Sequence, residues 1–213
     1  PKGVLHIRSD ADWAQINDPQ LTTFCVHAGD YTAVGSLRLT ASGDASTPRV
    51  IRFYDGKASS PAPWRRAVGD RALVARLEFD GASHWIVERL AIGKTTQRTN
   101  LVRFAAGATF NVVHRCLIET GGGGGGQISI GGDDNVVQFS VLRETIVSPG
   151  DDNHCIKISG GAKRCRIVQN EIYDCAGDGI QVGSAPLPAA SYEGTVIAGN
   201  DIYCDKHCGK GEN

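Results

Sequence analysis

The sequence predicts an all-β protein whose short strands are wound into a solenoid. Along its second half, pairs of aliphatic residues recur with the two members five positions apart, and no helical periodicity connects them. The first members lie at positions 87, 113, 137, 167 and 197, so successive intervals are 26, 24, 30 and 30 residues. Repeats of this length, built from short strands and Gly, Asn or Asp turns, are typical of β-solenoids. The pairs are Val87/Ile92, Val113/Ile118, Val137/Leu142, Ile167/Ile172 and Ile197/Ile202.

Residues 1–74 are expected to form an N-terminal cap followed by irregular first coils. Ser9-Asp10 offers an N-cap to a short amphipathic helix over residues 11–17, which Asp18-Pro19 would end. Solenoids need such a cover over their open end. Strands are expected at residues 3–8, 22–27, 37–40 and 47–53, with a surface loop at 55–70.

Residues 75–213 are expected to form regular coils. In the first strand of each coil, two apolar residues flank one residue that period-two alternation turns outward. The inward pairs are Leu77/Phe79, Val102/Phe104, Ile128/Ile130, Ile156/Ile158 and Ile180/Val182. The outward row between them is therefore Glu78, Arg103, Ser129, Lys157 and Gln181.

The corner between the second and third strands of each coil supplies another column. Asn170 and Asn200 occupy equivalent positions in it and predict two rungs of an asparagine ladder. At residues 205–213 the pattern calls for another inward-facing first strand, so the chain is expected to stop mid-coil. A further segment or a subunit would then cover the C-terminal end.

Composition limits the classes of function. The chain has 213 residues and a net charge of −1, which indicates neither a nucleic-acid footprint nor a basic membrane patch. One domain over residues 1–213 is expected, and no apolar run approaches the ~20 residues of a membrane span. The chain begins with Pro1 and has no Met, as a removed signal peptide or trimming would explain.

Seven cysteines are many for a cytosolic protein of this size, which favours an exported one. None forms a CxxC pair, so a zinc knuckle is not indicated. Cys175 and Cys204 lie in adjacent coils, which stack ~4.8 Å apart, and we expect them to be bonded. Cys204–Cys208 is the local alternative, whereas Cys25 and Cys116 also suit small buried hydrophobic positions.

These repeats, together with the stretch HAGDY followed by LRLTASGDASTPRVIRF, resemble the secreted polysaccharide-active proteins of the pectate-lyase-like superfamily. The resemblance implies a right-handed parallel β-helix, here of about six or seven coils with an N-terminal helical cap. It also implies that a substrate would lie along the groove beside the first-strand sheet. The same fold carries lyases, hydrolases, epimerases and adhesins, so fold does not decide the chemistry.

Lyases of this superfamily cleave uronic-acid glycans by β-elimination, which needs a cation near the carboxylate and a base for the neighbouring proton. Lys157 is the candidate base and Arg103 the candidate cation. His154 is a candidate acid or substrate contact, with a turn residue as the alternative role. Gln181, Ser129 and Glu78 would bind substrate from the same row. Lys157 and Arg103 are two rungs apart, ~10 Å, a spacing that suits two carboxylate subsites. Solvated charges on a sheet face are the alternative interpretation.

A Ca²⁺ ion could also neutralise the substrate. Asp151 and Asp152 precede the Lys157 strand, and Asp178 occupies the equivalent turn one coil later. Hard oxygen ligands from adjacent coils would meet there. Asp is also a default residue of tight turns, which is the competing explanation.

Two other functions remain open from the sequence. The segment at residues 150–158 partly resembles polygalacturonase-type inverting hydrolases, but the Gly-His-Gly and Arg-Ile-Lys motifs of that family are missing. Such an enzyme needs two carboxyl groups ~6.5–9.5 Å apart. A non-catalytic glycan-binding or structural surface β-helix is the leading alternative to the lyase.

Overall fold

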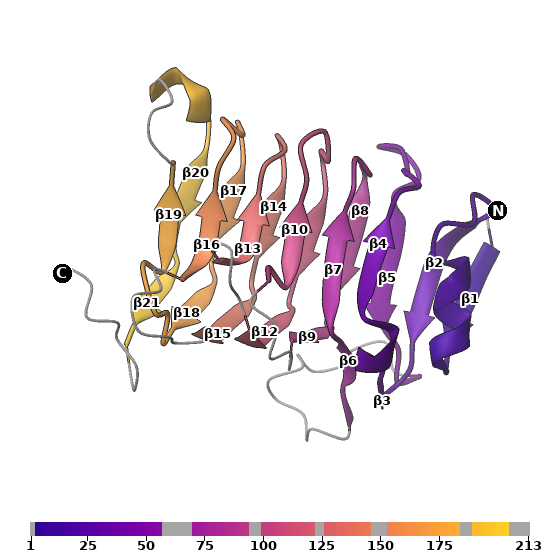
Figure 1. Cartoon of the computed structure of the whole chain (residues 1–213). Helices are drawn as coiled ribbons and strands as arrows, with labels where there is room; N and C mark the ends of the chain where they lie inside the picture. Colours follow the sequence, from indigo (N-terminus) through magenta and orange to yellow (C-terminus); the bar gives the residue numbers. More distant parts are fainter. Residues whose placement is uncertain are drawn as a thin grey trace.

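The computed structural model of the chain describes residues 3–56, 70–93, 99–121, 126–145, 153–183 and 189–204. Its strands form three parallel sheets that run the length of an elongated molecule (Figure 1). We number the sheets by the order in which one coil visits them. Each strand pairs in parallel with its counterpart in the coils before and after it, which confirms the predicted all-β solenoid.

Sheet 1 consists of β4 (Ser36–Leu39), β7 (Arg76–Phe79), β10 (Val102–Phe104), β13 (Gly126–Ile130), β16 (His154–Ile158) and β19 (Ile180–Val182). Sheet 2 consists of β1 (Gly3–Ile7), β2 (Leu21–Val26), β5 (Arg49–Phe53), β8 (Trp85–Glu88), β11 (Val112–His114), β14 (Val136–Gln138), β17 (Arg166–Val168) and β20 (Val196–Ala198). Sheet 3 consists of β3 (Gly29–Asp30), β6 (Ala72–Val74), β9 (Ala91–Gly93), β12 (Leu117–Gly121), β15 (Val141–Thr145), β18 (Glu171–Tyr173) and β21 (Asp201–Tyr203).

In the described part of the chain, five regular coils run from β7 to β21, preceded by the less regular strands β1–β6. This is slightly fewer regular coils than the expected six or seven. The N-terminal strands depart from the regular repeat because the intervals between them are longer and uneven, as between β4 and β5.

The core lies between the three sheets and is built from the inward-facing aliphatic positions that the repeat predicted. Ile118 stacks between Ile92 of the preceding coil and Leu142 of the next, and all three are fully buried. Phe79 and Phe104 stack face to face on the sheet 1 side, with ring centroids 4.6 Å apart. Each coil therefore covers the core of its neighbour, as solenoid packing requires.

The predicted asparagine ladder is present at the corner between sheets 2 and 3. The Asn170 side-chain amide donates to Oδ1 of Asn200 at 3.0 Å, and the amide of Asn200 donates to the Ile167 carbonyl at 2.8 Å. Oδ1 of Asn170 accepts the backbone N–H of Ser140. The ladder satisfies buried polar groups that the turn would otherwise leave unpaired.

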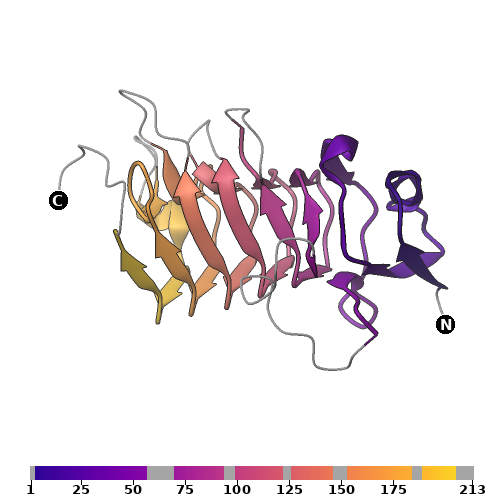
Figure 2. The same ribbon diagram turned by 90° about the horizontal axis from the view of Figure 1, so that it is seen from below.

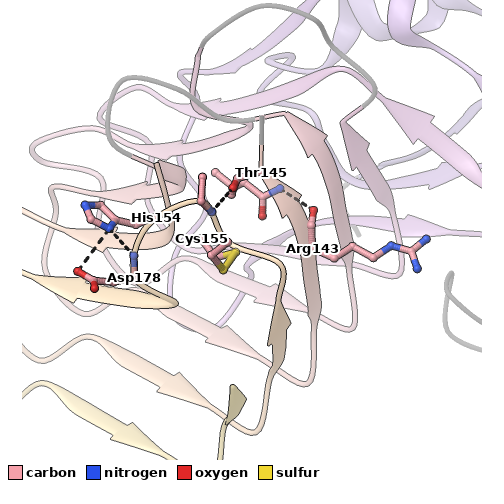
Figure 3. Close-up of a disulfide and its surroundings, with 8 residues drawn as sticks. Arg143, Thr145, His154, Cys155 and Asp178 are labelled. Atoms are coloured by element: carbon pink, nitrogen blue, oxygen red, sulfur yellow. Dashed lines mark hydrogen bonds and ion pairs between the residues drawn. A yellow bond between two sulfur atoms is a disulfide. The ribbon is translucent and has the colours of Figure 1, made fainter. Parts of the chain in front are cut away.

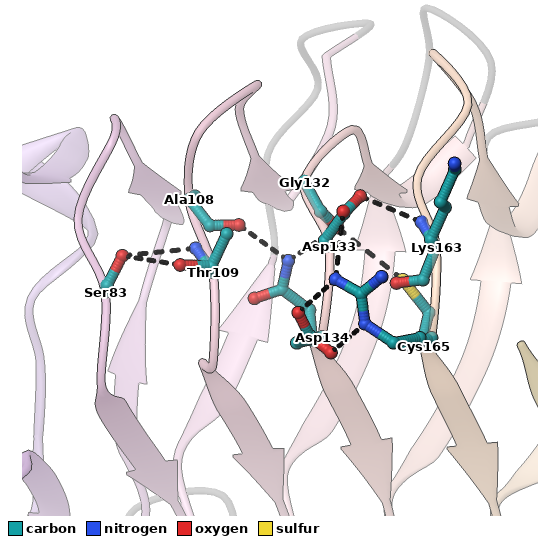
Figure 4. Close-up of polar contacts among 10 residues, drawn as sticks. Ser83, Ala108, Thr109, Gly132, Asp133, Asp134, Lys163 and Cys165 are labelled. Atoms are coloured by element: carbon teal, nitrogen blue, oxygen red, sulfur yellow. Dashed lines mark hydrogen bonds and ion pairs between the residues drawn. The ribbon is translucent and has the colours of Figure 1, made fainter. Parts of the chain in front are cut away.

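A second ladder follows the corner between sheets 1 and 2, where Asn111 donates to Oδ1 of Asn135 at 3.1 Å. On the outside of this corner, Ser83 and Thr109 share a hydroxyl hydrogen bond, and Asp133 accepts the backbone N–H of Lys163 (Figure 4). Arg164 also binds the carboxylates of Asp133 and Asp134. These side chains connect consecutive coils.

The N-terminal helix is a 3₁₀ helix, η1 (Asp10–Gln15), and not the longer helix expected over residues 11–17. The Asp12 carboxylate accepts hydrogen bonds from the backbone N–H groups of Arg8 and Ser9. These bonds lower the pKa of Asp12 and cap the N-terminus of the helix. Trp13 is buried in the core at this end of the molecule. Figure 2 shows this helix at the opposite end of the stack from the last coil.

The predicted Cys175–Cys204 bond is wrong, because Cys175 is bonded to Cys155 with 5.5 Å between the two Cα atoms (Figure 3). Cys155 lies in β16 and Cys175 follows β18, so the two meet at the corner where one coil closes on itself. Cys204 is also disulfide-bonded, and the alternative partner Cys208 lies outside the described residues.

Cys25 and Cys116 are buried free thiols, as the hydrophobic interpretation predicted. Burial raises the pKa of Cys116 to about 12, which suppresses its thiolate. In the described part of the chain, no helix is long and apolar enough to span a membrane.

Candidate functional site

The predicted outward row on sheet 1 exists, and the strand register places its members side by side. Arg103 pairs in register with Glu78 on one side and with Ser129 on the other. Lys157 lies between Ser129 and Gln181. Arg38 on β4 extends the row beyond Glu78. The sequence did not indicate Arg38 because β4 lies in the irregular part of the chain.

The half of the row nearer the N-terminus is charge-paired. The Arg103 guanidinium forms an ion pair with the Glu78 carboxylate, whose side chain is only 15% exposed. The Arg38 guanidinium binds the carboxylate of Asp80. Since both arginines already have carboxylate partners, an incoming anion must compete with Glu78 or Asp80 for them.

The other half of the row consists of Ser129, Lys157 and Gln181. Among the residues that the structure describes, none forms a hydrogen bond or an ion pair with the Lys157 ammonium group or the Ser129 hydroxyl. The Oε1 atom of Gln181 is shielded and has no hydrogen-bond partner in this part of the chain. Gly126 lies beside the Lys157 stem, since a Cβ on Gly126 would be 3.5 Å from the Lys157 Cβ.

His154 is in the same strand as Lys157, but its side chain is enclosed and only 1% exposed. Its Nδ1 atom accepts the backbone N–H of Asp178 at 3.0 Å (Figure 3). This bond assigns the lone pair to Nδ1 and, in neutral imidazole, the proton to Nε2. The hydrogen bond positions the turn before β19, and the predicted contact of His154 with substrate stays a prediction.

Asp178 is the one predicted metal ligand within the described chain, and its carboxylate is 60% exposed and 3.5 Å from Nδ1 of His154. Asp151 and Asp152 lie outside the described residues. Within the described ranges, no group of three or more His, Cys, Asp or Glu side chains has metal-binding geometry. The Ca²⁺ site therefore stays a prediction.

The turn that carries Asp178 is held firmly against the Lys157 strand. Thr145 Oγ1 accepts the backbone N–H of Ala176 at 2.6 Å, and the Asn153 carbonyl accepts that of Gly177 at 2.8 Å. The Cys155–Cys175 disulfide joins β16 itself to the start of this turn. The loop before β19 is thereby attached to the start of β16 beside the candidate site.

An additional polar cluster, which the sequence reasoning missed, lies on the outer face of sheet 3. The Arg143 guanidinium donates twice to the nearly buried Glu119 carboxylate, at 2.6 and 3.0 Å, and once to the Tyr173 hydroxyl at 3.1 Å. Burial alone would lower the pKa of Arg143, but the bonds to Tyr173 and Glu119 outweigh it and raise that pKa. The intervals of 24 and 30 residues between these positions match the repeat and could have revealed the cluster.

Comparison with solved structures finds the same fold in two polysaccharide lyases. The chain superimposes on an alginate lyase from Paenibacillus sp. str. FPU-7 with a TM-score of 0.61 and 14% sequence identity, over 93% of this chain and 66% of that one. A mannuronic acid specific polysaccharide family 6 lyase from human gut microbiota gives a TM-score of 0.50 at 13% identity, over 95% and 64%.

The chain thus spans about two thirds of the length of these structures. No protein-family model and no curated protein matches its sequence. At this level of identity the likeness shows the fold, a parallel β-solenoid.

Proposed function

We propose that the protein is a polysaccharide lyase that cleaves a uronic-acid-containing glycan by β-elimination. The observation that carries the proposal is the environment of Lys157. Two basic side chains of the outward row, Arg38 and Arg103, bind carboxylates of the protein. The third, Lys157, has no partner among the described residues. It lies between Ser129 and Gln181, for which the described residues also provide no side-chain hydrogen bond. A partly exposed amino group without a protein partner, flanked by polar side chains on the outer face of sheet 1, suits contact with a sugar polymer.

The solved structures with this fold support the same class of substrate. One is described as an alginate lyase and the other as mannuronic acid specific, and both therefore act on polymers of uronic acids. Disulfide bonding in this chain fits an oxidising compartment, so we place the enzyme outside the cytoplasm. An acidic glycan is its proposed partner.

In the proposed reaction, the Lys157 amine in its neutral form takes the proton from the carbon next to the sugar carboxylate. The electrons of that C–H bond form a C=C bond and the C–O bond to the neighbouring sugar breaks. The leaving oxygen takes up a proton from water, and the Lys157 ammonium returns its own proton to the solvent. Ser129 and Gln181 would hold sugar hydroxyls on the adjacent rungs. Arg103 would bind the carboxylate of a sugar ~10 Å away, two rungs along the row, in competition with Glu78.

Calcium would supply further positive charge beside the scissile unit. Asp178 and the preceding-coil residues Asp151 and Asp152 are the candidate ligands, all of them hard oxygen donors. Of these, Asp178 presents an exposed carboxylate on a firmly held turn. His154 would orient this turn through its bond to the Asp178 backbone.

The proposal is tested by incubating the protein with polymannuronate, polyguluronate and polygalacturonate, each with Ca²⁺ or with a chelator. Ultraviolet absorbance of the unsaturated product is the readout. We expect absorbance to rise with at least one polymer and to be lost in Lys157→Ala. Lys163→Ala is the matched control and should retain activity, because Lys163 lies at the corner of sheets 1 and 2 outside the row.

A flat trace on every polymer, from protein with an intact β-sheet circular dichroism spectrum, would exclude the lyase. Binding of the polymers without cleavage would then favour the glycan-binding module. New reducing ends without ultraviolet absorbance would instead indicate a hydrolase.

A further inference from the structure

A column of four side chains lies along the corner between sheets 2 and 3, on consecutive coils. Its members follow β8, β11, β14 and β17, have a left-handed backbone with φ between 51° and 61°, and are Arg89, Arg115, Phe139 and Gln169. The residue after each of them is buried in the core, so the column itself faces outward. This corner is the one that does not border sheet 1. The column, which we call the corner column, therefore lies across the solenoid from Lys157.

The two arginines of the corner column have no carboxylate partner among the residues that the structure describes. The Nε atom of Arg89 is shielded and forms no hydrogen bond there. Several other arginines of the chain do have such partners, namely Arg103 with Glu78, Arg143 with Glu119 and Arg164 with Asp134. Since the backbones of Arg89 and Arg115 lie one rung apart, ~4.8 Å, two like charges occur on neighbouring rungs without a counter-charge.

The surroundings of these arginines are positively charged as well. Burial lowers the pKa of His114, and the charges of Arg115 and Arg89 lower it further. Glu88 opposes them, but its carboxylate is already paired with Arg52, at 3.4 Å from the Arg52 Nε atom. The described part of this corner thus has an excess of positive charge, which attracts an anionic ligand.

The next two rungs of the corner column add an aromatic ring and an amide. Phe139 is 40% exposed, and the His114 ring packs against it at right angles, with 5.5 Å between the ring centroids. Gln138 forms a hydrogen bond with Nδ1 of His114 at 3.3 Å, so the Phe139 ring is held in place and still left exposed. The exposed Gln169 side chain forms no hydrogen bond with the described residues.

We propose that the corner column is a second binding site for the uronic-acid polymer, separate from the Lys157 row. The two guanidinium groups bind sugar carboxylates, a pairing that is charge-assisted and often bidentate. The Phe139 ring packs on the apolar C–H face of a sugar, and the Gln169 amide binds hydroxyl groups. The step of ~4.8 Å between rungs is close to the length of one sugar unit, so a polymer along the solenoid axis meets one rung per unit. The inference rests on the proposed function for the choice of polymer.

The test measures binding of polymannuronate, polyguluronate and polygalacturonate by affinity gel electrophoresis, with Lys157→Ala in every protein so that no polymer is cleaved. We expect Arg89→Gln/Arg115→Gln to bind at least one polymer about tenfold more weakly. Phe139→Ala should also weaken binding, with an unchanged dependence on salt because it removes no charge. The matched control Lys163→Gln/Arg164→Gln removes two charges from the corner between sheets 1 and 2 and should bind normally.

A second measurement leaves the corner column unchanged and covers the case in which its variants fold poorly. Phenylglyoxal modifies accessible guanidinium groups, and mass spectrometry locates the modified residues. Bound polymer should protect Arg89 and Arg115 in Lys157→Ala protein, while Arg164 stays as reactive as before.

Equal affinity of the column variant and the control would overturn the proposal, as would a lack of protection. Equal binding of polyglutamate, which has carboxylates and no sugar faces, would overturn it too. The outcome is distinct from that of the lyase test. Loss of binding in the column variant supports the second site even if the protein with Lys157 cleaves no polymer, whereas cleavage by that protein together with unchanged binding refutes the second site alone.

Discussion

At the scale of single residues, environment separates side chains that the sequence presents as equals. Arg103 and Lys157 both face outward from sheet 1, two rungs apart, and the sequence made them the candidate cation and the candidate base of one reaction. Arg103 is held by Glu78, whereas no described residue binds Lys157. The ion pair lowers the availability of Arg103 to an anionic ligand, so Lys157 becomes the centre of the proposed site.

The lowered pKa values of His27 and His114 should make the stability of the protein depend on pH. Burial lowers the pKa of both, with help from Arg8 for His27 and from Arg115 for His114. The folded state therefore binds fewer protons than the unfolded state, in which the pKa of His is ~6.5. The stability they contribute is complete above ~6.5 and is lost as pH falls from there towards the lower folded-state pKa.

We expect the free energy of unfolding, measured by urea titration, to decrease as the pH is lowered from about 7.5 to about 5.5. The double variant His27→Gln/His114→Gln should show a smaller slope over the same window. Equal slopes for the two proteins would show that these histidines do not drive the effect.

At the scale of elements, the corners between sheets hold the coils in register. Non-glycine residues adopt a left-handed backbone at equivalent corner positions, as Arg89, Arg115, Phe139 and Gln169 do between sheets 2 and 3. The residue after each turn then faces inward, and an Asn there can bond the next coil. The Asn ladder is therefore a consequence of turn geometry as much as of side-chain chemistry.

We expect Asn170→Ala to lower the free energy of unfolding by about 1–3 kcal/mol, because it leaves buried partners such as the Ser140 N–H and the Val137 carbonyl unpaired. Gln169→Ala is the control, since the neighbouring Gln169 side chain is not part of the ladder. Chemical unfolding of both variants measures the difference. A loss no larger than that of the control would contradict a stabilising ladder.

At the scale of the whole molecule, each coil depends on its neighbours for burial, so position along the axis decides what a core residue contributes. Ile118 has coils on both sides and is fully buried, whereas Ile202 is 49% exposed on the last coil. We expect Ile118→Ala to lower the free energy of unfolding by about 2–5 kcal/mol and Ile202→Ala by clearly less.

Urea unfolding of the two variants and of the wild-type protein measures the difference. Equal losses for the two variants would mean that the last coil is covered as completely as the central one.

Several features followed from the sequence because they depend on local alternation and repeat length. The recurrence of the aliphatic pairs from coil to coil places Ile118 above Ile92. Together with the period of two, it determines that one face carries Glu78, Arg103, Ser129, Lys157 and Gln181. The Asn170–Asn200 ladder followed from the same repeat. These inferences need only the register, which the hydrophobic pattern specifies.

Other features were decided by the tertiary structure. Cys175 bonds Cys155 because both lie in one coil, whose first and last strands meet at a corner. The sequence argument considered only the distance between stacked coils and therefore predicted a partner in the next coil. The pairing of Arg103 with Glu78 and of Arg143 with Glu119 depends on side-chain conformations and burial, which residue order does not specify. The sequence by itself thus determined the fold and the row of candidate residues. Only the packed structure decided which of those residues have protein partners, because partners are chosen by three-dimensional proximity.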